Sequence, residues 1–184
     1  MCLFTRQYGA HMKTNELTDI IARKTGMPFS DVHLYARRLR ESGFLPQGSR
    51  GKVAPDIAPE HAAHLIIALM ATDIARQAPQ RVATYMAASE RLAATLADPE
   101  EAALFSEARI TRGDDVATMS LKWNGEPKHS TDYTVHVMEG GGVWFELVSQ
   151  THAEPVKNRD TYLDVEAALR GDLIRTVAVA LAAG

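Results

Sequence analysis

The chain lacks the features that a disulfide-linked, secreted or membrane-spanning protein needs. Its single cysteine, Cys2, excludes an internal disulfide and a zinc site built on cysteines. Its longest apolar runs, residues 62–71 and 177–183, are too short to span a bilayer. The first residues have no charged start followed by an apolar block, so we expect no signal peptide. A cytoplasmic protein with no membrane partner is the expectation.

Motifs of catalysis and cofactor binding are also missing. The sequence contains no G-x-S-x-G, no H-E-x-x-H and no dinucleotide-binding fingerprint after a strand. We therefore predict no catalytic residues, no enzyme activity and no cofactor. A hydrolytic or deaminase site built from His129, His136 and His152 is the alternative that the sequence leaves open.

Two further groups of polar residues are weak candidates for a site. His61 and His64 lie one turn apart on an expected helix, but no third ligand follows at a suitable spacing. We therefore predict no metal and interpret both histidines as surface or capping residues. The acidic pairs at residues 100–101 and 114–115 are adjacent in sequence and would point in different directions, so we interpret both as solvated surface.

The composition is that of a globular protein. Hydrophobic residues make up 46% of the 184 residues, which allows one mid-sized domain or two small ones. The segment Gly9-Ala10-His11-Met12 is typical of a cloning junction. We divide the chain into residues 1–12 (cloning remnant or disordered), 13–54 (helix-turn-helix domain), 55–98 (helical linker or assembly segment) and 99–184 (α+β domain).

Positive charge is concentrated near the N-terminus, although the formal net charge of the chain is −3. Residues 13–54 carry eight lysines and arginines against four acidic residues, whereas residues 55–184 carry eleven against nineteen. This distribution is expected when one region meets phosphate and the other stays away from it. Chance clustering is the alternative for so small an excess.

The positive region contains two short amphipathic helices joined by a tight turn. The first is expected to end at Gly26, and Ser30 is a candidate N-cap for the second. The second helix has an apolar stripe that would face inward, formed by Val32, Tyr35, Ala36 and Leu39. This arrangement predicts a helix-turn-helix, for which an αα-hairpin used only in packing is the alternative.

Residues 18–37 resemble the twenty-residue pattern of prokaryotic and phage helix-turn-helix proteins. Ala22 matches the small residue at the helix contact, and Gly26 matches the glycine of the turn. The apolar positions of the pattern are matched by Ile21, Met27, Val32 and Tyr35. The resemblance covers about a tenth of the chain and implies double-stranded DNA as the partner, with no particular regulator family.

The polar face of the second helix is the predicted DNA-binding surface. Arginines on a free helix face can reach base edges in the major groove. Residues 47–52 are expected to form a flexible basic loop, placed where a wing or arm would follow the DNA backbone or enter the minor groove. Phe44 and Leu45 are expected to fold back on the helical core. The predicted DNA-binding residues are Ser30, His33, Arg37, Arg38, Arg40, Arg50 and Lys52.

Further structure is expected after residue 55. Two apolar helices are predicted at residues 59–75 and 79–97, and we interpret them as the element that joins two protomers in a homodimer. Alternating apolar residues then predict strands at residues 116–123, 133–137 and 143–147. A helix at residues 161–183 would cover this sheet. The expected fold class is α+β, with a helix-turn-helix bundle, long helices and a three-stranded antiparallel sheet under a C-terminal helix.

The function predicted from these features is sequence-specific DNA binding by a transcriptional regulator of phage or mobile-element type. A DNA-binding scaffold, such as a terminase small subunit or an accessory recombination factor, would show the same N-terminal pattern. A protein-interaction module is the third possibility. The oligomeric mass and a sequence selected from random DNA would distinguish these classes.

Overall fold

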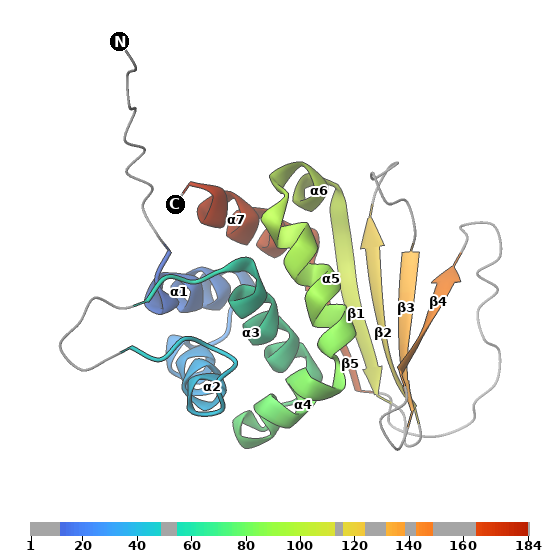
Figure 1. Ribbon diagram of the computed structural model, residues 1–184, viewed down its shortest axis with the longest axis horizontal. Helices are drawn as coiled ribbons and strands as arrows, with labels where there is room; N and C mark the ends of the chain where they lie inside the picture. The colour runs from blue at the N-terminus through green and yellow to red at the C-terminus, as the bar shows by residue number, and fades with distance from the viewer. Residues whose placement is uncertain are drawn as a thin grey trace, which may run out of the picture.

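Helices make up most of the described chain and lie together on one side of a β-sheet (Figure 1). The computed structural model describes residues 12–48, 55–112, 116–123, 132–138, 143–148 and 165–183. Its helices are α1 (Thr14–Thr25), α2 (Phe29–Glu41), α3 (Pro59–Ala71), the 3-10 helix η1 (Ala75–Gln77), α4 (Ala78–Thr84), α5 (Met86–Ala97), α6 (Pro99–Leu104) and α7 (Gly171–Ala182). Its strands are β1 (Phe105–Arg112), β2 (Val116–Trp123), β3 (Asp132–Met138), β4 (Val143–Val148) and β5 (Val165–Arg170).

The helices α1 and α2 form the expected pair joined by a tight turn. Gly26 ends α1 with a φ of 74°, and its N–H donates to the carbonyl of Ala22 at 2.9 Å. A residue with a Cβ would adopt this left-handed conformation only at a cost of about 1–2 kcal/mol. The predicted inner stripe of α2 is confirmed, because all four of its members, Val32, Tyr35, Ala36 and Leu39, are buried.

The start of α2 differs from the prediction. The helix begins at Phe29, with Pro28 as its N-cap residue, and it has no side-chain cap. Ser30 therefore lies inside the first turn, where its hydroxyl donates to the Asp31 carboxylate at 3.3 Å. Pro28 replaces a side-chain cap because its carbonyl accepts the N–H of Asp31 at 3.0 Å. The prediction of Ser30 as N-cap is wrong.

The helix α3 lies at the centre of the helical layer. It contacts α2, α5, α7 and the sheet strands β1 and β5, and most of its residues are buried. A helix that is apolar on all sides belongs inside a protein. Leu45 is also buried, and Phe44 packs partly against the same core, as predicted.

Both long helices expected after residue 55 are interrupted. The first ends at Ala71 because Thr72 is extended (φ −159°, ψ 148°), and the Thr72 hydroxyl accepts the N–H of Ile74 at 3.0 Å. The second breaks at Tyr85, whose φ of −102° and ψ of 28° separate α4 from α5. Tyr85 is almost fully buried, so its side chain is anchored where the backbone leaves the helical conformation.

The predicted three-stranded sheet is wrong. Within the described residues, the sheet has five antiparallel strands in the order β4-β3-β2-β1-β5. The strand β1 was not predicted at all, and β5 lies inside the range expected to be helical. Ala108 of β1 faces Leu169 of β5, and Ile110 faces Ala167. Pairing with β1 provides partners for the backbone N–H and C=O groups of β5. This segment is therefore a strand and not the first part of a helix over residues 161–183.

The C-terminal helix is correspondingly shorter than expected. The helix α7 begins only at Gly171, directly after β5. It packs against α1, α5, α6 and β1, and buries Leu173, Ile174, Val177 and Ala178. It therefore joins the helix-turn-helix pair to the rest of the helical layer, where we had expected only a cover for the sheet.

Glu101 shows that one acidic pair was misinterpreted as solvated surface. Glu100 is exposed as expected, but Glu101 is only 8% exposed. The Glu101 carboxylate lies 2.6 Å from the guanidinium of Arg91 on α5 and accepts the Thr95 hydroxyl at 2.9 Å. This polar cluster joins α5 to α6. The second pair, at residues 114–115, lies outside the described residues.

The cluster around Glu101 predicts a strong effect of one substitution. Glu101→Ala removes the carboxylate from a largely buried guanidinium and a buried hydroxyl, so we expect a loss of about 1–3 kcal/mol in the free energy of unfolding. Glu100→Ala, one position away on the surface, should change the free energy by about 0.5 kcal/mol or less. Urea denaturation of the two variants measures the difference, and equal effects would contradict the interpretation.

Candidate nucleic-acid interface

The outer surface of α2 presents three arginines. A helix turns by about 100° per residue, so the positions opposite the buried stripe can be assigned directly. Arg37 lies near the middle of this outer face, on the same line as Ser30 and Glu41. Its side chain is 63% exposed and that of Arg38 is 42% exposed. The guanidinium groups thus lie on the outside of the molecule, away from the sheet.

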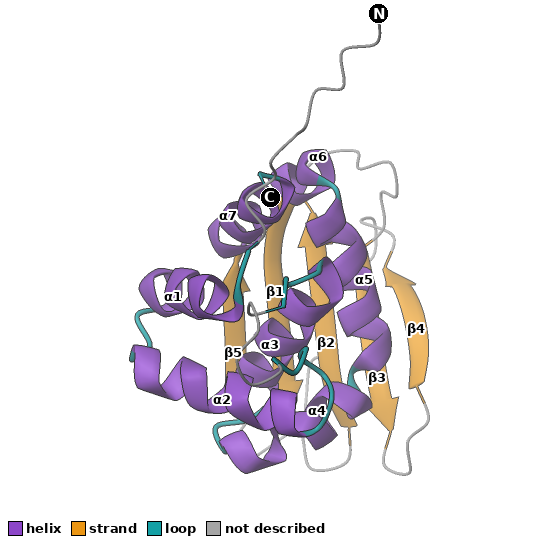
Figure 2. Cartoon of the chain, turned by 60° about the vertical axis from the view of Figure 1, so that its left-hand side comes forward, coloured by secondary structure: helices purple, strands orange, loops and turns teal. Residues whose placement is uncertain are grey.

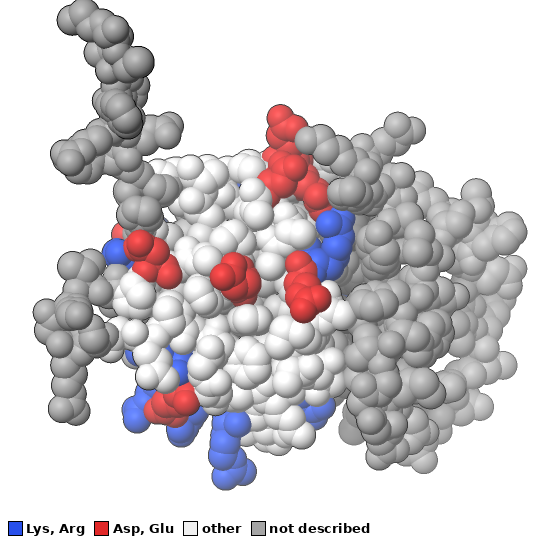
Figure 3. All heavy atoms as spheres, in the orientation of Figure 1, with Lys and Arg blue, Asp and Glu red and all other residues white. Residues whose placement is uncertain are grey.

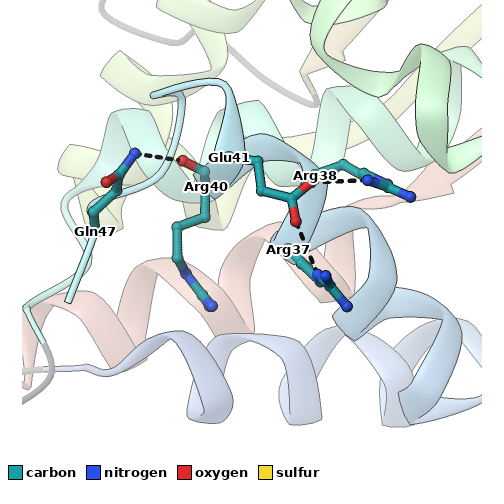
Figure 4. Close-up of polar contacts among 5 residues, drawn as sticks. All are labelled: Arg37, Arg38, Arg40, Glu41 and Gln47. Carbon is teal, nitrogen blue, oxygen red and sulfur yellow. Dashed lines mark hydrogen bonds and ion pairs between the residues drawn. The ribbon is translucent and has the colours of Figure 1, made fainter. Parts of the chain in front are cut away.

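Glu41 holds two of these arginines. Its Oε1 accepts from Nε of Arg37 at 2.9 Å, and its Oε2 accepts from Nη1 of Arg38 at 2.9 Å (Figure 4). The hydrogen bonds from Arg37 and then from Arg38 hold the pKa of the Glu41 carboxyl below its usual value. One carboxylate therefore positions both guanidinium groups, although the pairs are exposed and individually weak.

Arg40 lies apart from this group. Its side chain points away from the Glu41 carboxylate, and its backbone carbonyl accepts Nε2 of Gln47 at 3.2 Å (Figure 4). His33 lies on the same side of α2, half-buried, with its ring 5.8 Å from that of Phe29. Arg40 and His33 therefore border the face on which Arg37 is central.

The two basic residues predicted in the loop, Arg50 and Lys52, lie outside the described residues. The described residues on either side of that segment are close together. A Cβ placed on Gly48 would lie 3.5 Å from Cδ of Pro55. Since Gln47 is bound to the carbonyl of Arg40, the chain leaves and re-enters the described part of the molecule near the C-terminal end of α2.

Three charged residues on α2 and on the elements that pack against it were missed. Glu41 had a visible signal, because it follows Arg38 and Arg37 by three and four positions, which is the spacing of helical ion pairs. Arg76 and Arg81 had no such signal. They lie on η1 and α4, far along the chain, and only the packing of those elements against α2 brings them near.

The paired histidines on α3 have structural roles. His61 Nδ1 accepts the N–H of Ala58 at 3.0 Å and so caps the helix. His64 Nδ1 donates to the carbonyl of Phe44 at 3.0 Å, and its ring meets the edge of the Phe44 ring. The prediction of a capping role is confirmed for His61. Within the described residues, no group of three potential metal ligands is present.

Three histidines, His129, His136 and His152, would form the alternative hydrolytic site. His129 and His152 lie outside the described residues. His136 is on β3, where it pairs with Thr118 and Trp144, and only its backbone is described.

Comparisons with known proteins add no relative. No family model, no curated protein and no solved structure matches this chain. Among the described helices, none has the length and apolar character that crossing a membrane requires.

The capping role of His61 predicts a dependence of stability on pH. Burial lowers the pKa of His61, with a smaller opposing effect of Glu60 and a smaller reinforcing effect of His64. In the unfolded chain His61 takes up a proton near pH 6.5, whereas in the folded protein it does so only at a lower pH. The stability that the neutral ring contributes should be complete above about pH 6.5 and decline as the pH falls below it.

A glutamine at position 61 distinguishes the capping hydrogen bond of this side chain from its change of protonation. His61→Gln keeps a side-chain acceptor for the Ala58 N–H, as in a capping box, but has no proton to gain. We expect the free energy of unfolding to fall more steeply in the wild type than in the variant between about pH 7.5 and 5.5. Parallel pH profiles from urea denaturation would show that His61 does not titrate differently on folding.

Proposed function

We propose that this protein binds double-stranded DNA sequence-specifically and acts in the cytoplasm as a transcriptional regulator of phage or mobile-element type. The observation that carries the proposal is the outer face of α2, where Glu41 holds Arg37 and Arg38 side by side in the second helix of a helix-turn-helix pair. The second helix of such a pair is the element that enters the major groove in DNA-binding proteins.

In this mechanism α2 lies in the major groove with Arg37 at its centre. A guanidinium can donate two hydrogen bonds to the O6 and N7 atoms of guanine, which makes Arg37 the main base-reading residue. Ser30 and His33 contact base edges or phosphates nearer the start of the helix, and Arg38 does so from the flank of α2. Arg40, together with Arg50 and Lys52, contacts the backbone and supplies affinity that does not depend on sequence.

Glu41 has a defined part in this proposal. Its carboxylate restricts the rotamers of Arg37 and Arg38 before DNA arrives, so less side-chain entropy is lost on binding. It also places a negative charge on a surface that meets phosphate. We therefore propose that Glu41 lowers affinity for DNA in general while it favours the sequence that Arg37 can read.

A homodimer remains part of the proposal, but α3 cannot provide its interface. That helix is buried within the protomer. Selection of bound sequences from a random duplex pool, combined with the mass of the complex, tests function and symmetry together. A palindromic consensus with a dimer supports the regulator, whereas a ring-sized assembly indicates a scaffold such as a terminase small subunit. No enrichment of any sequence contradicts sequence-specific binding.

Arg37→Ala tests the base-reading assignment. If Arg37 is bidentate to guanine, its loss should cost about 1–3 kcal/mol of binding to the selected site and relax the preference at one base pair. Arg175→Ala, which removes the same charge from α7, should leave both unchanged. Fluorescence anisotropy with the selected duplex and its single-base variants provides the measurement. Unchanged affinity and preference in Arg37→Ala would remove the assignment.

Glu41→Gln tests the role of the carboxylate. Removing its charge should strengthen binding to duplexes of unrelated sequence by on the order of fivefold, the equivalent of about 1 kcal/mol. Binding to the selected site should improve less, so the ratio of specific to non-specific affinity falls. The matched control is Glu90→Gln on α5. A variant that binds both duplexes as the wild type does would show that Glu41 has no influence on DNA.

A further inference from the structure

Most cations of the described residues already have an acidic partner. Carboxylates pair with Lys13, Arg23, Lys24, Arg37, Arg38, Arg91 and Arg109. Within the part of the chain whose side chains are described, four arginines have none: Arg40, Arg76, Arg81 and Arg175. At these four residues an external anion therefore meets no competing carboxylate.

Three of the four lie on elements that pack together. The helix α2 carries Arg40, η1 carries Arg76 and α4 carries Arg81, and both η1 and α4 contact α2. The connection is anchored by Tyr35 of α2, whose hydroxyl donates to the carbonyl of Thr72 at 2.7 Å, just before η1. The arrangement is therefore part of the folded core and does not depend on a loop.

The molecular surface shows the result of this packing. The helices α2 and α4 run side by side at the lower end of the helical layer (Figure 2). In the view of Figure 3, basic side chains gather along the lower edge beneath α2 and α4, and most acidic side chains lie higher. The positive surface thus continues beyond the helix-turn-helix pair.

We infer that Arg76 and Arg81, the flanking arginine pair, bind phosphates of the DNA backbone beside the segment that α2 reads. Arg76 is exposed and Arg81 is half-buried, so both can meet a ligand. Cations left without carboxylates next to a DNA-binding helix match a polyanion, and each neutralised phosphate releases counterions. This inference rests on the proposed function, and it extends the surface that contacts DNA beyond α2, the turn and the basic loop.

The test uses two duplexes that contain the sequence selected by the wild-type protein. The short duplex ends at the selected sequence, and the long one extends it by about one helical turn, roughly 10 base pairs, on each side. The variants are Arg76→Gln/Arg81→Gln, its charge-conserving counterpart Arg76→Lys/Arg81→Lys, and the control Arg175→Gln. Affinity is measured over a range of salt concentrations.

The wild type should bind the long duplex more tightly than the short one. The double glutamine variant should lose on the order of tenfold affinity for the long duplex, and the slope of log affinity against log salt should become smaller by about two units. Its binding to the short duplex should stay unchanged. The double lysine variant should keep the wild-type slope, because point charges suffice for phosphate, and Arg175→Gln should behave as the wild type.

The remaining outcomes overturn the inference in distinguishable ways. A double glutamine variant that binds the long duplex like the wild type shows that the flanking arginine pair does not contact DNA, while Arg37→Ala can still support the proposed function. An equal loss on both duplexes places the two arginines inside the α2 footprint. A loss that the lysine variant shares indicates a structural role. If the wild type binds no duplex at low salt, the proposed function fails as well.

Discussion

The burial of most of α3 is the constraint on which the rest of the structure depends. This helix contacts α2 as well as α5, α7 and the strands β1 and β5. The helix α2 covers part of its apolar surface and packs with Val32, Tyr35, Ala36 and Leu39 inward. The polar face of α2 then points outward as a geometric consequence. The same contact brings η1 and α4 beside α2.

The arginines of α2, η1 and α4 are of two kinds, those with a carboxylate partner and those without one. Arg37 and Arg38 are held by Glu41, which limits the orientations that their side chains can adopt. Arg40, Arg76 and Arg81 have no carboxylate partner within the described residues. A held guanidinium suits a contact that requires fixed geometry, whereas a free one suits a phosphate that can be approached from several directions. The proposed readout of bases and backbone follows this division.

Several errors of the sequence-based prediction have one cause, which is that tertiary contacts overrode local pattern. A single helix was expected over residues 161–183, but pairing with β1 makes part of this range the strand β5. Tyr85 lies within an unbroken helical pattern, yet its burial coincides with the break between α4 and α5. Glu101 looked like surface because its partner Arg91 lies on a different helix. None of these partners is visible in a local window.

The sequence by itself determined the pair of helices α1 and α2 and the tight turn between them: the glycine that the turn requires at Gly26, the inner stripe of α2 and the outward position of Arg37. These features depend on backbone conformation and helical period, which neighbouring residues specify. Only the tertiary structure decided the five-stranded sheet and the shorter α7. It also decided the burial of Glu101 and the position of Arg76 and Arg81 next to α2. The physical reason is that strand pairing and shared surfaces join residues that are far apart along the chain, while the buried ion pair of Glu101 joins two different helices.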